Sequence, residues 1–279
     1  MKNKTAHIII ISVSIIIFIG FFLFIINYLF DWNYSGSKFI KRILPAAVSS
    51  GKMISLYDFE KLAVINSKQD FSAFSTKNLI RDRLLKYRVA DKFKCLKNYD
   101  FINQDYYFYE DTIKSISEDD LRNLGIDSKE DYVEYVIKPQ IIEDCLRINY
   151  NLVNVGNSES YHEAQSILVR VLGNLSSFGE IAKNSSDDLE SAVLEGDLGF
   201  IRKSDVVPEI WDAISVAKPG EIIPDIISSR LGYHILYLSE IGTKDEQKHY
   251  RVKQIQVNTS GFENWFSAQS KMYNVIFIK

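Results

Sequence analysis

The stretch that decides the fold runs from Gly196 to Ile235 and carries four short motifs. They are Gly-Asp-Leu-Gly-Phe at 196–200, Val-Pro-Glu at 207–209, Lys-Pro-Gly-Glu at 218–221 and Gly-Tyr-His-Ile at 232–235. Glycine and proline are the strongest local markers of turns, because glycine tolerates positive φ and proline restricts φ to one narrow range. The series therefore predicts a strand, a helix, a tight turn and two further strands, in that order.

The four motifs, in this order, resemble the second half of a parvulin-type (PpiC, rotamase) peptidyl-prolyl cis-trans isomerase domain. Two helical segments before them, Ala-x-x-Ile-Leu at 164–168 and Phe-x-x-x-Ala at 178–182, resemble the first two helices of that family. The resemblance covers about residues 160–241. It implies an α+β fold with helices around an antiparallel sheet, and cis-trans isomerisation of prolyl bonds in other polypeptides.

The domain's opening strand is missing from its usual place. A parvulin domain normally begins with a histidine-bearing strand, and nothing before Ser160 supplies one. The segment 249–257 has the shape of that strand and follows the strand 233–241 after a short polar connector, which favours an antiparallel hairpin. We therefore predict a circularly permuted domain in which 251–257 pairs with 233–238, since the ends of a domain are often close together.

Three polar residues match the family's catalytic cluster. The resemblance assigns this role to His234, to Asp188 and to Gln254, which stands where the family's opening strand carries a histidine. Side chains alternate along a strand, so His234 and Gln254 are able to face one another, although glutamine cannot titrate. Two plainer interpretations stay open: His234 as a hydrogen-bonded core histidine, and Asp188 as a helix cap.

Five apolar residues are candidates for the substrate-binding walls: Leu198, Phe200, Val206, Ile210 and Leu236. The family usually has methionine and phenylalanine where this chain has Val206 and Ile210, and both replacements are smaller. The sequence therefore leaves two functions open. One is a prolyl isomerase, and the other is a non-catalytic chaperone that binds extended or unfolded polypeptide through a degenerate groove.

Serine-containing caps predict where several helices begin. The pattern Ser-x-x-Glu occurs at 160–163, 177–180 and 260–263 and is typical of a capping box. Ser128, with Asp131 three residues later, predicts another helix start. Pro139 is expected to kink or restart that helix, because proline suits a first turn and not an interior.

The segment before this domain is mainly helical in pattern. Residues 45–48, followed by a glycine turn at Gly51, resemble the opening of the SurA-like and PrsA-like extracytoplasmic foldases. Residues 75–96 carry apolar residues at helical spacing. Residues 98–111 are rich in tyrosine and phenylalanine, which favours rings packed between helices, with an aromatic surface for unfolded clients as the alternative. The chain is expected to end in a strand at 274–279.

Residues 8–30 form an almost unbroken apolar run without a charge. At helical rise the run spans roughly 34 Å, enough for the apolar core of a bilayer. The alternative is a cleaved signal peptide, whose apolar region is normally shorter. Tyr28 and Trp32 suit the membrane interface. Basic residues on the two sides nearly balance, so an extracytoplasmic location of the large domain comes from the resemblance and not from charge.

These signals divide the chain into a membrane anchor at 1–34, a helical SurA-like domain at 35–157 and a parvulin-like domain at 158–279, with the opening strand at 250–257. Unfolded or exported polypeptides and membrane lipid are the expected partners. A net charge of −3 gives no reason to expect nucleic acid. No metal-binding spacing or cofactor motif occurs, so no cofactor is expected. Cys95 and Cys145 are expected to be two buried thiols, with a disulfide as the alternative.

Overall fold

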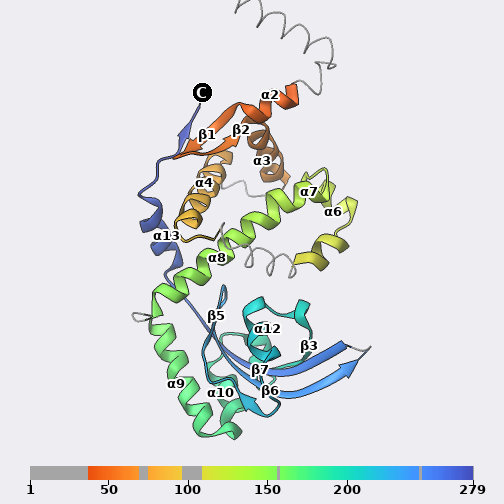
Figure 1. The fold of residues 1–279 in the computed structure, drawn as a ribbon, viewed down its shortest axis with the longest axis vertical. Helices are drawn as coiled ribbons and strands as arrows, with labels where there is room; N and C mark the ends of the chain where they lie inside the picture. Colours follow the sequence, from red (N-terminus) through yellow and green to blue (C-terminus); the bar gives the residue numbers. More distant parts are fainter. Residues whose placement is uncertain (1–36, 69–74, 96–108, 156–157, 245–246, 279) are drawn as a thin grey trace, which may run out of the picture. The chain divides into compact units, whose positions relative to one another are not determined.

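The structure is a computed structural model that describes residues 37–68, 75–95, 109–155, 158–244 and 247–278 (Figure 1). The chain divides into two compact units, residues 1–80 with 275–279, and residues 81–274. Among the described residues no helix is long and apolar enough to cross a membrane. The predicted anchor at 8–30, and most of the aromatic segment at 98–111, lie outside the described residues.

The first unit is built on a small three-stranded sheet of order β2-β1-β8. Strands β1 (Pro45–Ser49) and β2 (Lys52–Ser55) form an antiparallel hairpin, so the segment after Gly51 is a strand before it becomes helix α3 (Leu56–Lys68). Helix α2 (Ser37–Ile43) precedes the hairpin. The predicted final strand is β8 (Ile276–Phe277), and it pairs with β1.

The helices of the second unit begin largely where the sequence indicates. Ser128 caps α7 by accepting a hydrogen bond of 3.1 Å from the Asp131 amide. Pro139 lies in the first turn of α8, after a π-helical segment at Val133–Ile137, so the predicted kink or restart takes the form of a change from π-helix to α-helix. The α-helices are α4 (Thr76–Lys92, which begins in the first unit), α6 (Glu118–Leu124), α7 (Lys129–Tyr132), α8 (Lys138–Val153), α9 (Glu159–Gly173), α10 (Phe178–Ser185), α11 (Leu189–Ala192), α12 (Pro208–Ser215) and α13 (Phe262–Ser270).

The three predicted capping boxes are wrong. Helix α9 is capped by Ser158, whose hydroxyl accepts from the Tyr161 amide, because the chain is still extended there. Ser177 already belongs to a 3-10 turn at 175–177, so its hydroxyl donates to a carbonyl instead of capping α10. Helix α13 starts after Gly261, which has a φ of 91° and no side chain to cap with. The Ser-x-x-Glu pattern gave these starts within a few residues, but the backbone conformation selects the cap.

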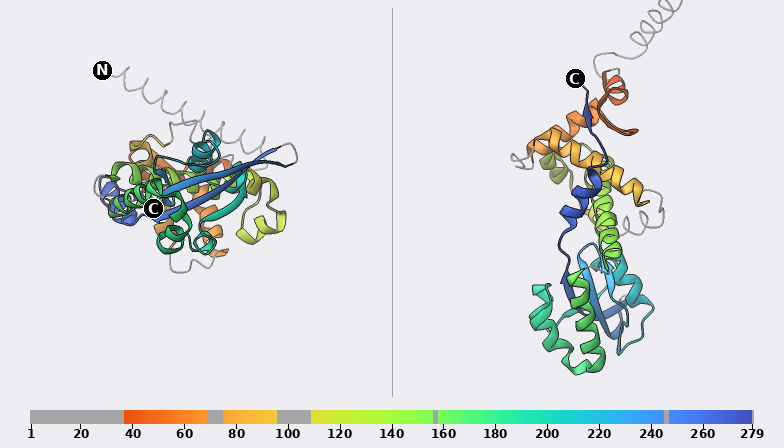
Figure 2. Two further views of the ribbon diagram at one scale, coloured as in Figure 1. Left: turned by 90° about the horizontal axis from the view of Figure 1, so that it is seen from below. Right: turned by 90° about the vertical axis from the view of Figure 1, so that its left-hand side faces the viewer.

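The main sheet has the order β3-β7-β6-β4, with β5 also paired to β6, and all its pairs are antiparallel. Tyr233 pairs with Val257 and Leu238 with Val252, so the predicted pairing of 251–257 with 233–238 is confirmed. The two strands form the long blue ribbon in Figure 2. The strands are β3 (Asp197–Ile201), β4 (Glu221–Ile222), β5 (Ile227–Ser229), β6 (Gly232–Lys244) and β7 (Gln247–Asn258).

Each face of this sheet has its own apolar cluster. Alternate residues of β6 and β7, beginning with Tyr233 and Ile235, pack with α9 and α10 on one face. The other alternate residues, including Leu236 and Leu238, pack with α12 on the opposite face. His234 and Gln254 belong to this second set by alternation, so they lie on the same face as α12.

Two motif glycines lie against the backbone of β7. Gly196 has a φ of 80°, and a Cβ added there would lie 2.5 Å from the carbonyl oxygen of Gln254. Gly232 has a φ of 140°, and a Cβ there would overlap the carbonyl oxygen of Val257. Any other residue would be strained in φ and would also displace the central strand. Both glycines are therefore required by the strand that lies between β3 and β6.

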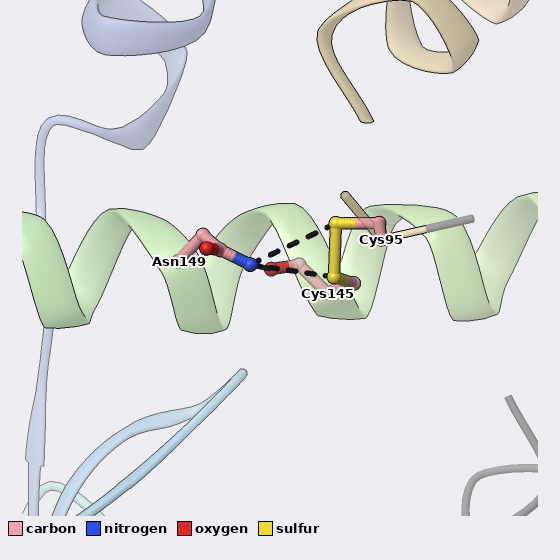
Figure 3. The surroundings of a disulfide bond; sticks show 3 residues. All are labelled: Cys95, Cys145 and Asn149. Atoms are coloured by element: carbon pink, nitrogen blue, oxygen red, sulfur yellow. Dashed lines mark hydrogen bonds between the residues drawn. A yellow bond between two sulfur atoms is a disulfide. The ribbon is translucent and has the colours of Figure 1, made fainter. Parts of the chain in front are cut away.

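The two cysteines are joined by a disulfide, so the expectation of two free thiols is wrong. Cys95 follows α4, Cys145 lies on α8, and their Cα atoms are 6.0 Å apart. The side-chain amide of Asn149, one turn along α8, donates to the Cys145 carbonyl at 2.9 Å. The same nitrogen faces both sulfur atoms (Figure 3). Both cysteines are buried in one apolar cluster, as expected, but only the tertiary structure brings them together.

Gly232→Ala should lower the free energy of unfolding by about 3 kcal/mol or more, because it combines backbone strain with overlap on β7. The matched control is Gly220→Ala. Gly220 also has positive φ, at 86°, but nothing lies within 4 Å of an added Cβ, so a loss of about 1 kcal/mol is expected. Urea unfolding measures both. Equal losses in the two variants would show that contact with β7 does not constrain Gly232.

The variant Cys95→Ser/Cys145→Ser should be less stable than the oxidised wild type by about 3 kcal/mol, since the bridge closes a loop with a sequence separation of 50. Urea unfolding with and without reductant measures the loss. Reductant should lower the stability of the wild type and leave that of the variant unchanged. Two thiols that alkylate in unreduced, unfolded wild type would contradict the bridge.

Candidate functional site

The site is centred on His234, which lies on β6 with none of its surface exposed. Both ring nitrogens have hydrogen-bond partners. Nε2 lies 2.7 Å from the Ser229 hydroxyl oxygen, and Nδ1 lies 3.2 Å from Oε1 of Gln254. The interpretation of His234 as a hydrogen-bonded core histidine is therefore correct as a description of its surroundings.

The hydrogen-bonded series continues from Gln254 to Asp188. Gln254 lies on β7, is 6% exposed, and donates from Nε2 to Oδ2 of Asp188 at 2.8 Å. Asp188 also caps α11, where it accepts from the Ser191 hydroxyl at 2.5 Å. The structure thus unites the three residues that the sequence predicted, and Asp188 serves both as a cap and as the end of the series. We name Ser229, His234, Gln254 and Asp188 the buried relay.

Burial and hydrogen bonding set the charges of the relay. Burial lowers the pKa of His234 to about 4, against the opposing effects of Gln254 and of the Asp188 charge. Burial alone would raise the pKa of Asp188, but the hydrogen bonds from Ser191 and Gln254 hold it below its usual value. At neutral pH the relay therefore holds a neutral imidazole and an ionised carboxylate.

Ser229 is a site residue that the sequence reasoning missed. It lies on β5, just before the turn into β6, and its main chain is held by α8, since Asn151 donates to the Ser229 carbonyl at 2.7 Å. The Tyr233 hydroxyl in turn donates to the Asn151 carbonyl at 2.8 Å. The sequence did contain an indication of this role. Residues 227–229 lie across a tight turn from the Gly-Tyr-His motif, so a hydroxyl at this place is close to the imidazole.

A partly buried ion pair fixes the same turn. Arg230 lies 3.2 Å from Asp144 on α8, whose carboxylate also accepts from Gln140 and from the Tyr109 hydroxyl. Burial raises the pKa of Asp144, and the charge of Arg230 opposes that rise. These contacts attach the turn that carries Ser229 to helix α8.

Four of the five predicted apolar wall residues belong to the cluster on the same face of the sheet as the relay. Leu198 and Val206 are half-buried at the edge of the α12 cluster, whereas Ile210 and Leu236 are buried inside it. Phe200 is 47% exposed and lies outside that cluster, with its ring close to the backbone of Gly242. The role of these five residues in substrate binding stays a prediction.

A family model for the rotamase, or PPIC-type PPIASE, domain matches residues 151–240. This segment is a PPIC-type PPIASE domain. The match ends before β7, although β7 lies between β3 and β6 in the sheet. The domain's sheet is thus completed by a strand that follows the matched residues in the chain.

Curated proteins are similar to part of the chain. A chaperone SurA from Nitrosospira multiformis is 36% identical over 110 residues, which are 37% of this chain and 24% of that protein. A foldase protein PrsA from Staphylococcus aureus is 33% identical over 107 residues, or 35% of this chain and 33% of that protein. The chain therefore matches only a quarter to a third of the length of these curated relatives.

Among solved structures, a peptidylprolyl isomerase (PrsA) from Bacillus anthracis aligns with 78% of this chain and 86% of its own. The sequence identity is 20% and the TM-score is 0.24.

Stability should fall as the pH drops from about 6.5 to 4. His234 has an ordinary pKa of 6.5 when unfolded and about 4 when folded, so in this window the unfolded chain binds a proton that the folded chain does not. The contribution is complete above this window, and roughly 3 kcal/mol is lost across it. Urea unfolding at several pH values measures the slope. His234→Gln is the control, since it replaces the imidazole with an amide that does not titrate, so the slope due to His234 should disappear. Equal slopes in the two proteins would contradict the prediction.

Proposed function

We propose that this protein is a membrane-anchored foldase that isomerises prolyl peptide bonds in exported polypeptides outside the cytoplasm. The observation that supports this most is the buried relay, which lies in the sheet of a PPIC-type PPIASE domain and on the same face as a mainly apolar cluster. The relatives named chaperone and foldase are consistent with unfolded polypeptides as partners.

The chemistry of the reaction fits a site without a nucleophile. The cis and trans forms of a prolyl bond differ by about 0.5–1 kcal/mol, but resonance makes their exchange slow. A catalyst need only bind the twisted amide better than either planar form. In this proposal the proline ring rests on the surface near Leu198 and Val206, while the relay keeps the neighbouring strands rigid and their polar atoms fixed.

Two observations support the proposed location. The apolar run at 8–30 is long enough to anchor the chain in a membrane. The disulfide between Cys95 and Cys145 is typical of proteins in oxidising compartments outside the cytoplasm. The domain limits at 1–34, 35–157 and 158–279 remain proposals about family modules. The two compact units of the structure divide the chain differently. Their boundary falls after Ile80, and the final strand belongs to the first unit.

A non-catalytic chaperone is the second candidate function. It is favoured by the burial of His234 and Gln254, which keeps both side chains from direct contact with a substrate on the surface. The small side chains at Val206 and Ile210 favour it as well. In this case the domain would bind extended polypeptide without lowering the isomerisation barrier.

An isomerisation assay on a proline-containing peptide distinguishes the two functions. Asp188→Asn keeps the size of the side chain but removes the charge that ends the relay, and should lower kcat/KM about tenfold, or about 1.4 kcal/mol. Gln254→His should raise it. The matched control is Asp187→Asn, because the Asp187 carboxylate accepts from the Asn258 amide and stands outside the relay. The activity of this variant should stay near that of the wild type.

A wild type with no isomerase activity that still suppresses aggregation of an unfolded client would establish the chaperone function instead. If the wild type shows neither property, both functions are wrong. Far-ultraviolet circular dichroism and urea unfolding of each variant separate a loss of activity from a loss of fold.

A further inference from the structure

We propose that Gln254 and Ser229 are positioning residues that hold His234 in a single tautomer, with the proton on Nδ1 and the Nε2 lone pair bound by the Ser229 hydroxyl. This inference concerns the proton positions inside the buried relay. It goes beyond the proposed function, because it would also hold in a protein that binds polypeptide without isomerising it.

Asp188 fixes the direction of the first hydrogen bond in the relay. Its carboxylate is ionised, so it can only accept hydrogen bonds. The Gln254 side chain lies 2.8 Å away and must therefore present its NH₂ group to Asp188. The opposite orientation would bring two acceptor oxygens together in a partly buried place, which is costly. Asp188 thus decides which way the amide of Gln254 points.

The orientation of Gln254 in turn decides the tautomer of His234. With its NH₂ group on Asp188, Gln254 directs its carbonyl oxygen at Nδ1, at 3.2 Å. A carbonyl oxygen only accepts, so Nδ1 must carry the proton. A neutral imidazole has one such proton, and Nε2 is therefore a bare lone pair.

Ser229 completes the order at the other end. Its hydroxyl lies 2.7 Å from Nε2 and donates to the lone pair. The same oxygen accepts a hydrogen bond from the Leu231 amide at 3.0 Å, so the hydroxyl has both a donor and an acceptor partner. Every polar group from Leu231 to Asp188 is then satisfied with one arrangement of protons.

A glutamine differs from the family's histidine at this point because its two ends cannot exchange roles by titration. The amide keeps one donor end and one acceptor end at any ordinary pH. A histidine at 254 could adopt the same arrangement while neutral. Once protonated it would offer a donor to Nδ1 of His234 and would move the proton of His234 to Nε2. Gln254 thus makes the tautomer independent of pH wherever His234 is neutral.

Nitrogen NMR of the full-length chain with ¹⁵N-labelled histidine tests this directly. The protonated and the bare ring nitrogen of a neutral imidazole resonate far apart, and the His234 signals are assigned from their absence in His234→Gln. We expect wild-type His234 to be Nδ1-protonated, by a ratio of roughly tenfold or more, with no change between about pH 6 and 8. A signal for Nε2–H, or an even mixture, would overturn the proposal.

The variants Gln254→Met and Gln256→Met form a matched pair. Both glutamines lie on β7, but Gln256 donates to Asn258 and stands outside the relay. Gln254→Met should remove the bias and allow both tautomers, whereas Gln256→Met should keep the wild-type signals. An unchanged tautomer in Gln254→Met would show that Gln254 does not position the ring.

A third variant covers the case in which Gln254→Met does not fold. Ser229→Ala should keep the proton on Nδ1, since Gln254 is intact, but shift the Nε2 resonance toward that of an unbound lone pair. No shift would exclude Ser229 as the partner of Nε2. None of these readouts depends on isomerase activity, so the proposed function and the proposed tautomer can fail separately.

Discussion

The backbone of β7 is the constraint on which the rest of the second unit depends. It pairs with β3 on one side and with β6 on the other, and it is the only strand of the described sheet that joins these two. The glycines of two separate motifs, Gly196 and Gly232, both lie against its carbonyl oxygens. Its side chains contribute to both apolar clusters and also supply Gln254. Without β7 the strand β3 would lose its ladder partner, and His234 would lose one of its two hydrogen bonds.

The buried relay shows how polar groups are accommodated at the centre of this sheet. Burying an imidazole, an amide and a hydroxyl is costly unless each finds a partner, and here each does. The cost is met by contacts from three separate parts of the chain: the β5–β6 turn, the strand β7 and the first turn of α11. Burial keeps His234 neutral at neutral pH, against the opposing effects of Gln254 and of the Asp188 charge. A relay of this kind is rigid, because moving one member leaves the others unpaired.

Helix α8 connects the relay to the helical part of the second unit. Asn151 and Asp144, nearly two turns apart on α8, hold the main chain of Ser229 and the side chain of Arg230. The same helix carries Cys145, so the disulfide and the relay are attached to one rigid element. The turn with Ser229 is therefore held on two sides: by α8 and by its pairing with the start of β6.

The sequence by itself determined the elements and much of the site. Glycine and proline motifs placed β3, α12 and β6, and alternation along two strands put Gln254 on the same face as His234, because such patterns are local and periodic. It also predicted the pairing of β7 with β6 from a short polar connector. Only the tertiary structure decided the helix caps, the disulfide and the role of Ser229. Each of these depends on the backbone conformation or on residues far apart in the chain, as with Cys95 and Cys145 or Asn151 and Ser229, and no local pattern records which distant atoms will meet.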